Sequence, residues 1–262
     1  MSQNIVQIDS FTDRPFAGNP AAVCLMEKPA DPKWMLRVAL EMNLSETAFL
    51  YPVDNGYHLR WFTPTTEVEL CGHATLATAH LLFEDGHVPR DKTIRFQTLS
   101  GELTATFDKG WILLDFPAHP PRVIQPPPEL VKIFGDSLVS VAALDTSLIA
   151  ELVSDDAVRS FRPDFAAIAA LPKGLLTVTA KSSRPPVDFV SRFFAPGLGI
   201  PEDPVTGYAH TVLGPFWMNK LGKSEFLAYQ ASARGGYIKV KVMGNRVILG
   251  GQAVTVMHGE LT

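Results

Sequence analysis

The most restrictive feature of this chain is an internal repeat, because a duplicated unit limits the fold to two similar halves. The sequence "LRWFTP" at 59–64 returns in altered form as "SRFFAP" at 191–196. Further landmarks follow each copy in the same order: Gly72 and Gly207, Gly86 and Gly222, Gln97 and Gln230, and Gly110 and Gly244. Several landmarks in one order at a spacing near half the chain indicate duplication.

Each half mixes short strand patterns with one unusually apolar helix. Short runs rich in β-branched and aromatic residues, such as residues 57–63 and 111–116, predict strands. Residues 31–42 predict a helix that Asp31 caps and Pro32 begins. The stretches 74–85 and 208–221 are apolar nearly all round, as in helices surrounded by protein. We therefore expect an α+β fold of two similar halves, each a curved sheet or barrel around a central helix.

A proline-rich segment separates the repeats. Residues 116–130 read "FPAHPPRVIQPPPEL", which resists a helix interior and a central strand. We therefore expect an N-terminal half at 1–116, a linker at 117–130 and a C-terminal half at 131–262. The last strand could also pack back on the first half.

Composition excludes several classes of protein. The net charge of -4 comes without a basic block, which disfavours nucleic-acid binding. No apolar run reaches the roughly 18 to 20 residues of a membrane span. The first residues lack the pattern of a signal peptide, and two cysteines make no disulfide framework, so we expect a cytoplasmic protein.

The two glycines that open the apolar helices indicate a binding site. The first turn of a helix carries unpaired N–H groups and the positive end of the helix dipole. Gly72 and Gly207 would allow a ligand close to that backbone. If the halves face each other about a pseudo-twofold axis, both helix starts could bind one carboxylate or other small anion in a cleft. The simpler alternative is that each glycine only permits a tight turn.

Ionisable side chains lie at or near these helix starts. His73 follows Gly72, and Asp203 precedes the second helix. Glu46 stands where a loop enters an apolar strand, a position that can direct a carboxylate inward. The three residues could handle protons in one pocket, although a core histidine, a helix cap and a surface glutamate remain alternatives.

Four sequence blocks resemble the phenazine-biosynthesis PhzF-like family. They are "DSFTDRPFAGNPAAV", "NLSETAFL", "RWFTPTTEVELCGHATLATAHLLF" and "EDPVTGYAH". The resemblance implies a fold like that of diaminopimelate epimerase, in a homodimer. In the phenazine enzyme the reaction is isomerisation of a dihydro-hydroxyanthranilate by moving a proton without a cofactor.

The resemblance also implies roles for individual residues. Glu46 would be the general acid/base, and His73 and Asp203 would line the site and orient substrate and glutamate. The remaining positions would contact the substrate and its carboxylate: Asn19 in the first block, Gly72, Gly207 and Tyr208.

Two positions depart from the related families. Tyr208 stands where the PhzF-like family commonly has a small serine, which should alter the shape of the site. Diaminopimelate epimerase uses one cysteine from each half, but here Cys71 is matched by Thr206. A two-thiol racemase is therefore disfavoured, and Cys71 could simply be a small buried residue.

We expect a cofactor-independent isomerase that moves a proton on a small carboxylate-bearing metabolite by general acid/base catalysis. One alternative is an amino-acid racemase or epimerase that uses Glu46 with another base such as Cys71. Another is a non-catalytic protein that binds a ligand or partner. We expect no metal, because His73, His80 and His87 are too widely spaced for one ligand set on a helix turn.

Overall fold

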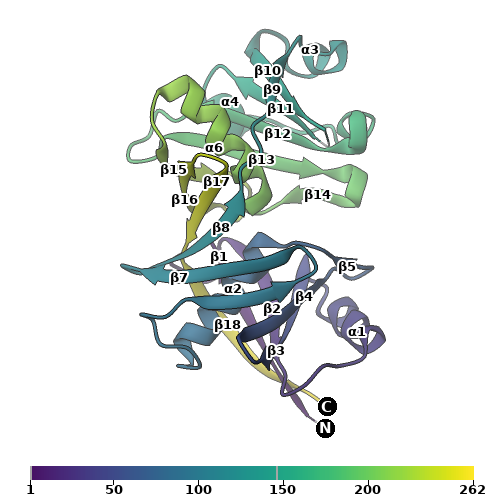
Figure 1. Cartoon of the computed structure of the whole chain (residues 1–262). Coiled ribbons are helices and arrows are strands. Elements are labelled where there is room, and N and C mark those ends of the chain that lie inside the picture. The colour runs from purple at the N-terminus through teal and green to yellow at the C-terminus, as the bar shows by residue number, and fades with distance from the viewer. Residues whose placement is uncertain (1, 146) are drawn as a thin grey trace. The chain divides into compact units, whose positions relative to one another are not determined.

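The computed structural model describes residues 2–145 and 147–262. It divides the chain into two compact units (Figure 1). The first unit comprises residues 1–116 and 250–262, and the second comprises residues 117–249. In the described part of the chain, no helix combines the length and the apolar character needed to span a membrane.

The first unit is built on one sheet with strand order β18-β1-β2-β3-β4-β6-β7-β8. The β2–β3 and β4–β6 pairs are parallel, and the other pairs are antiparallel. Its elements are β1 (Gln3–Ser10), β2 (Asn19–Leu25), α1 (Pro32–Met42), β3 (Glu46–Val53), β4 (Gly56–Phe62), β5 (Glu67–Val68), α2 (Gly72–Glu84), β6 (Ile94–Thr98), β7 (Gly101–Asp108), β8 (Trp111–Pro117) and β18 (Ala253–Leu261).

The second unit repeats this plan with strand order β9-β10-β11-β12-β13-β15-β16-β17. Here too the parallel pairs are the third and fifth, β11–β12 and β13–β15. Its elements are β9 (Arg122–Ile124), α3 (Pro128–Phe134), β10 (Leu138–Leu144), β11 (Ser147–Leu152), α4 (Asp155–Ser160), α5 (Phe165–Ala169), β12 (Leu176–Lys181), β13 (Phe189–Ala195), β14 (Ile200–Asp203), α6 (Gly207–Leu221), β15 (Glu225–Gln230), β16 (Gly236–Met243) and most of β17 (Arg246–Gly251), with short 3₁₀ turns at Gly135–Ser137, Pro172–Gly174 and Pro196–Leu198.

The matching strand orders and directions confirm the predicted duplication and the α+β class. β1 to β4 correspond to β10 to β13, α2 corresponds to α6, and β6 to β8 correspond to β15 to β17. The outermost position differs in origin. In the first unit it is filled by β18 from the end of the chain, and in the second by β9, which precedes β10 directly.

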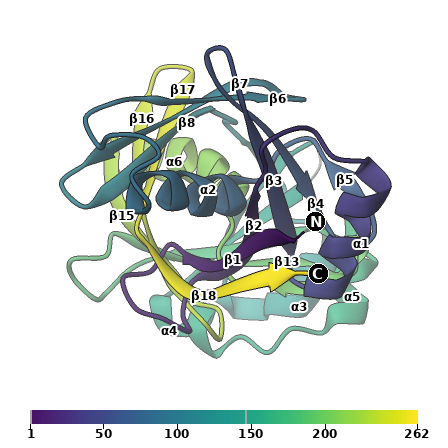
Figure 2. The same ribbon diagram turned by 90° about the horizontal axis from the view of Figure 1, so that it is seen from below.

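The two long helices of the repeat are enclosed by their sheets. Nearly every residue of α2 after Gly72 is buried, and α6 is buried from Gly207 to Trp217 except at Tyr208. Figure 2 shows α2 within the strands of its own unit. A helix without a polar face needs protein on every side, and a curved sheet supplies it.

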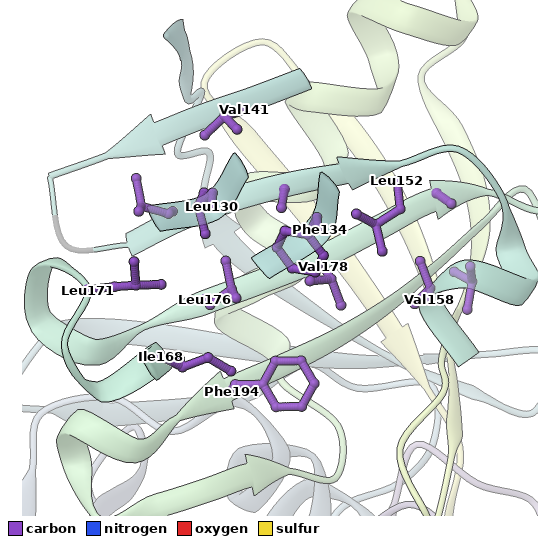
Figure 3. Packing of buried hydrophobic residues seen from close by; sticks show 14 residues of the cluster. Leu130, Phe134, Val141, Leu152, Val158, Ile168, Leu171, Leu176, Val178 and Phe194 are labelled. Atoms are coloured by element: carbon purple, nitrogen blue, oxygen red, sulfur yellow. The ribbon is translucent and has the colours of Figure 1, made fainter. Parts of the chain in front are cut away.

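Shorter helices cover the outer faces of the central strands. In the second unit α3, α4 and α5 place Leu130, Val158 and Ile168 against β10 to β13, where Val178 and Phe194 are fully buried (Figure 3). In the first unit α1 packs in the same way against β2, β3 and β4. The central strands are therefore buried on both faces, which explains their near-continuous apolar sequences.

The predicted linker at 117–130 is wrong, because these residues form part of the second unit. They include β9 and the start of α3, where Pro128 stands in the first helical turn. Pro215 lies inside α6 and has no N–H to bond Thr211 O. The backbone N–H of His119 donates to that carbonyl at 3.1 Å, so the proline-rich segment satisfies a group that the helix leaves open.

The close approach of α6 to β16 yields a stability prediction. A Cβ on Gly214 would lie 2.9 Å from Val240 Cγ1 and 3.1 Å from Val242 Cγ2. Alanine improves helix propensity by about 1 kcal/mol, but overpacking a core costs roughly 1 to 3 kcal/mol. We expect Gly214→Ala to lower the free energy of unfolding by about 1 kcal/mol in urea titrations. The loss should shrink in a Val240→Ala background, and a more stable single variant would contradict this packing.

Candidate functional site

The start of α2 is held by a hydrogen bond to the sheet rather than by a side-chain cap. Cys71 is the N-cap residue, and in the described structure its side chain makes no capping hydrogen bond to the helix. Ser10, at the end of β1, donates its hydroxyl to the carbonyl of His73 at 2.8 Å. This buried bond ties the helix start to the sheet and fixes the direction of the first turn.

Glu46 and His73 lie together at this helix start. Glu46 is the first residue of β3, which runs parallel to β2. Its Oε2 lies 3.2 Å from His73 Nε2, and the two side chains are only 14% and 6% exposed. Loop, strand and helix start therefore bring two residues 27 positions apart into direct contact inside the first unit.

Burial determines the charge of His73. Removal from water lowers the pKa of its imidazole from 6.5 to about 3, so the ring is neutral at pH 7. The contact with Glu46 is then not an ion pair between two full charges. It is a close contact between a carboxylate oxygen and a nitrogen of a neutral ring.

Cys71 lies against the other nitrogen of the same ring. Its Sγ is 3.5 Å from His73 Nδ1. One ligand atom from each of Glu46, Cys71 and His73 lies within 4.8 Å of the others, a group whose atoms suit a metal ion as well as a proton. We call these three residues the acid–thiol–imidazole cluster.

Asn19 lies beside this cluster in the sheet. It begins β2 opposite Ser10, the residue that bonds His73. Its side chain is fully buried, and its Oδ1 lies 3.5 Å from the hydroxyl of Ser45, which precedes Glu46. Asn19, a predicted contact residue, therefore neighbours Ser10, which bonds His73, and Ser45, which precedes Glu46.

The second unit has a different polar group before its helix. Asp203 ends β14 and accepts a hydrogen bond from Thr206 Oγ1, while Thr206 makes no side-chain cap on α6. Gln230 is fully buried and holds this loop at three points. Its Oε1 accepts from Thr206 N, and its Nε2 donates to Asp203 O and Thr206 Oγ1.

The first turns of α6 carry two aromatic side chains in different settings. His210 is fully buried, its Nδ1 lies 2.8 Å from Thr206 O, and burial lowers its pKa to about 4. Tyr208 is partly exposed, and its ring lies 5.4 Å from the ring of His119. Tyr208 therefore stands at the edge of the helix start, against the proline-rich segment.

An arginine–glutamate pair precedes each helix start. Arg60 on β4 donates through two nitrogens to Glu67 on β5, each at 2.7 Å. Arg192 on β13 donates two hydrogen bonds to Glu202 on β14, at 2.7 and 2.8 Å. Bidentate pairs of this kind are geometrically specific, so each one pins the short strand that leads into Gly72 or Gly207.

The structure thus brings together some predicted site residues within each unit. Glu46, His73, Gly72 and Asn19 meet in the first unit, and Asp203, Gly207 and Tyr208 lie at one helix start in the second. Sequence reasoning missed Ser10, Gln230 and the two arginine–glutamate pairs. Gln230 and Gln97 occupy matching positions of the repeat. Gln230 is buried and Gln97 is exposed, a difference that the sequence alone does not show.

The neutral state of His73 can be tested directly. Its ring signals in NMR should stay those of neutral imidazole from pH 8 down to about pH 5, because the pKa lies near 3. Between pH 6.5 and about pH 3, His73 is protonated in the unfolded chain but not in the folded chain. This group therefore lowers the free energy of unfolding as pH falls, by at most about 1.4 kcal/mol per pH unit.

A His73→Gln variant assigns the signal, and the protein unfolded in urea should titrate near 6.5 as the control. Titration of His73 near 6.5 in the folded protein would show that the ring is solvated or charged.

Comparisons with known proteins agree on one family. The family model for phenazine biosynthesis-like proteins, PhzC-PhzF, matches residues 8–259. An uncharacterized isomerase of Halalkalibacterium halodurans is 48% identical over 262 residues, which cover 100% of this chain and 99% of that protein. The crystal structure of a PhzF-family phenazine biosynthesis protein from Enterococcus faecalis matches with a TM-score of 0.95 and 42% identity over 100% of both chains.

A more distant structure agrees in fold alone. A predicted epimerase from Pseudomonas aeruginosa matches with a TM-score of 0.74 and 20% identity over 99% of both chains. The duplicated sheets and the solved neighbours together confirm the α+β, diaminopimelate epimerase-like fold. This chain belongs to the phenazine biosynthesis-like PhzC-PhzF family.

Proposed function

We propose that this protein is a cofactor-independent isomerase that moves a proton on a small, conjugated carboxylate. The observation that carries the proposal is the contact of Glu46 with neutral His73 at the start of an enclosed helix. The name of the Halalkalibacterium halodurans relative points to the same class of reaction.

The reaction needs one group that accepts a proton and then returns it. The carboxylate of Glu46 removes a proton from a carbon of the substrate, and the C–H electron pair moves into the conjugated system. The double bonds shift, and the Glu46 carboxylic acid returns the proton to another carbon. His73 can keep the carboxyl group oriented through both steps. A neutral ring can donate a hydrogen bond to the Glu46 carboxylate, and in its other tautomer it can accept one from the carboxylic acid.

The helix start suits the carboxylate of the substrate. Gly72 opens α2 at the positive end of the helix dipole, and the side chain of Cys71 does not cap it in the described structure. A substrate carboxylate there would place the reacting carbons beside Glu46. By the family resemblance, Asn19 of the same unit would also contact the substrate.

The spacing within the cluster disfavours a racemase that uses Glu46 and Cys71. Two bases on opposite faces of one carbon must be about 6 to 7 Å apart, because each needs a reach of about 3 to 3.5 Å. The ligand atoms of Glu46, Cys71 and His73 lie within 4.8 Å of one another. The thiol and the carboxylate are therefore too close together to hold one substrate carbon between them.

Isotope exchange distinguishes the proposed isomerase from a protein that binds the carboxylate without turnover. A thermal-shift screen of small unsaturated carboxylates selects ligands, and each is then incubated in D₂O with the protein. Appearance of deuterium on carbon, read by NMR or mass spectrometry, requires proton transfer. Binding with neither exchange nor isomerised product for every ligand found would contradict the proposed isomerase.

Glu46→Gln is the central variant in this assay. Glutamine keeps the shape of the side chain but cannot accept and return a proton, so exchange should fall by roughly 100- to 10,000-fold. Ligand-induced thermal shift should stay close to that of the wild type. Glu102→Gln, an exposed acid on β7 of the same unit, is the matched control and should keep full exchange. Exchange retained in Glu46→Gln would remove Glu46 as the base.

Tyr208 is expected to limit the size of the ligand. Its ring is partly exposed beside His119, at the first turn of α6. Tyr208→Ser should let the thermal-shift screen select bulkier carboxylates, with the free energy of unfolding changed by less than about 1 kcal/mol. An unchanged ligand profile would show that the phenol does not contact the ligand.

A further inference from the structure

The acid–thiol–imidazole cluster has a composition that proton transfer alone does not use. Glu46 and His73 are explained by the proposed function, but the thiol of Cys71 is not. A thiol, an imidazole and a carboxylate are the three side chains that bind Zn²⁺ and similar cations in proteins. Among the described residues, Glu46, Cys71 and His73 form a group of three such side chains whose ligand atoms lie close together.

Two of the three ligand atoms already stand at the separation of ligands on one cation. Zn²⁺ lies about 2.3 Å from sulfur and about 2.0 to 2.2 Å from nitrogen or oxygen, so its ligands stand roughly 3.3 to 3.8 Å apart. Glu46 Oε2 and His73 Nε2 are already 3.2 Å apart, whereas Cys71 Sγ lies 3.5 Å from Nδ1, the other nitrogen of the same ring. An ion on Nε2 therefore needs the Cys71 side chain to rotate toward the Glu46 side of the ring, within a group whose ligand atoms already lie within 4.8 Å of one another.

The surroundings favour a cation held by anionic ligands. Cys71 and His73 are buried at 7% and 5% exposure, and the 14% exposed side chain of Glu46 leaves a way in from solvent. The positive end of α2 opposes a bare cation, but the same field stabilises the thiolate that would bind it. A thiolate and a carboxylate together neutralise the two charges of the ion.

We propose that Glu46, Cys71 and His73 form an inhibitory site for a thiophilic divalent cation such as Zn²⁺. Binding breaks the S–H bond of Cys71, releases its proton to solvent and forms a metal–sulfur bond, with no change of oxidation state. The bound ion uses the carboxylate of Glu46 and so removes it from proton transfer. Inhibition of proton transfer by the ion rests on the proposed function, whereas binding of the ion does not.

The test uses Co²⁺ as the probe on the full chain, because a cobalt–thiolate bond gives a charge-transfer absorption band. We expect a band that saturates at one Co²⁺ per chain and disappears when Zn²⁺ displaces it. Cys71→Ser should lose the band. Cys24→Ser is the matched control and should keep it, because Cys24 lies fully buried in β2 and outside the cluster.

Two further variants test the other ligands. His73→Gln and Glu46→Gln should each weaken Co²⁺ binding by about tenfold or more. His80→Ala should leave the band unchanged, since His80 pairs with Glu84 farther along α2. Circular dichroism of each variant shows whether it is folded, and only folded variants are compared.

A band that persists in Cys71→Ser, or no band in the wild type, would overturn the proposal. In the D₂O assay Zn²⁺ at one equivalent should stop exchange, and a chelator should restore it. If Co²⁺ binds through Cys71 but no carboxylate ever exchanges, the metal site stands and the proposed isomerase fails.

Discussion

An apolar helix must be covered on every side, and this requirement shapes both units of the protein. α2 and α6 have no polar face, so each sheet curves around its helix and only the helix ends can meet solvent or a ligand. The N-terminal end carries unpaired N–H groups and a positive field. Enclosure of the helix therefore creates the place where a small anion is best received.

The same scaffold carries different chemistry in its two copies. Before α2 the first unit places Glu46, Cys71 and neutral His73. Before α6 the corresponding loop carries Asp203 and Thr206, held by buried Gln230. Both copies retain the bidentate pair that pins the preceding strand, Arg60 with Glu67 and Arg192 with Glu202. Duplication has thus kept the support and let the reacting groups diverge.

Much of the fold could be predicted from local patterns. The helix that Asp31 and Pro32 begin is confirmed, with Asp31 accepting a hydrogen bond from Lys33 N. The enclosed helices and the repeat are confirmed as well. β2 was missed, because a strand buried on both faces shows no alternation of apolar and polar residues.

The remaining errors concern contacts between distant residues. The proline-rich segment resembled a linker because its prolines exclude helix interiors and central strands. Its anchor is the bond from His119 N to Thr211 O, which exists because Pro215 cannot donate. Ser10 and Gln230 were missed for the same reason, since a serine at a strand end and a glutamine near a turn have no local pattern. Their importance comes from partners 63 and 24 positions away.

The central claim is that a single group, Glu46, both removes and returns the proton. The most direct measurement uses an active carboxylate labelled with deuterium at the carbon that loses its hydrogen, converted once in H₂O. Because the Glu46 side chain is only 14% exposed, the account predicts that part of the product keeps the label at its new position. Complete loss of the label from the first product molecules would contradict a single shielded acid/base group.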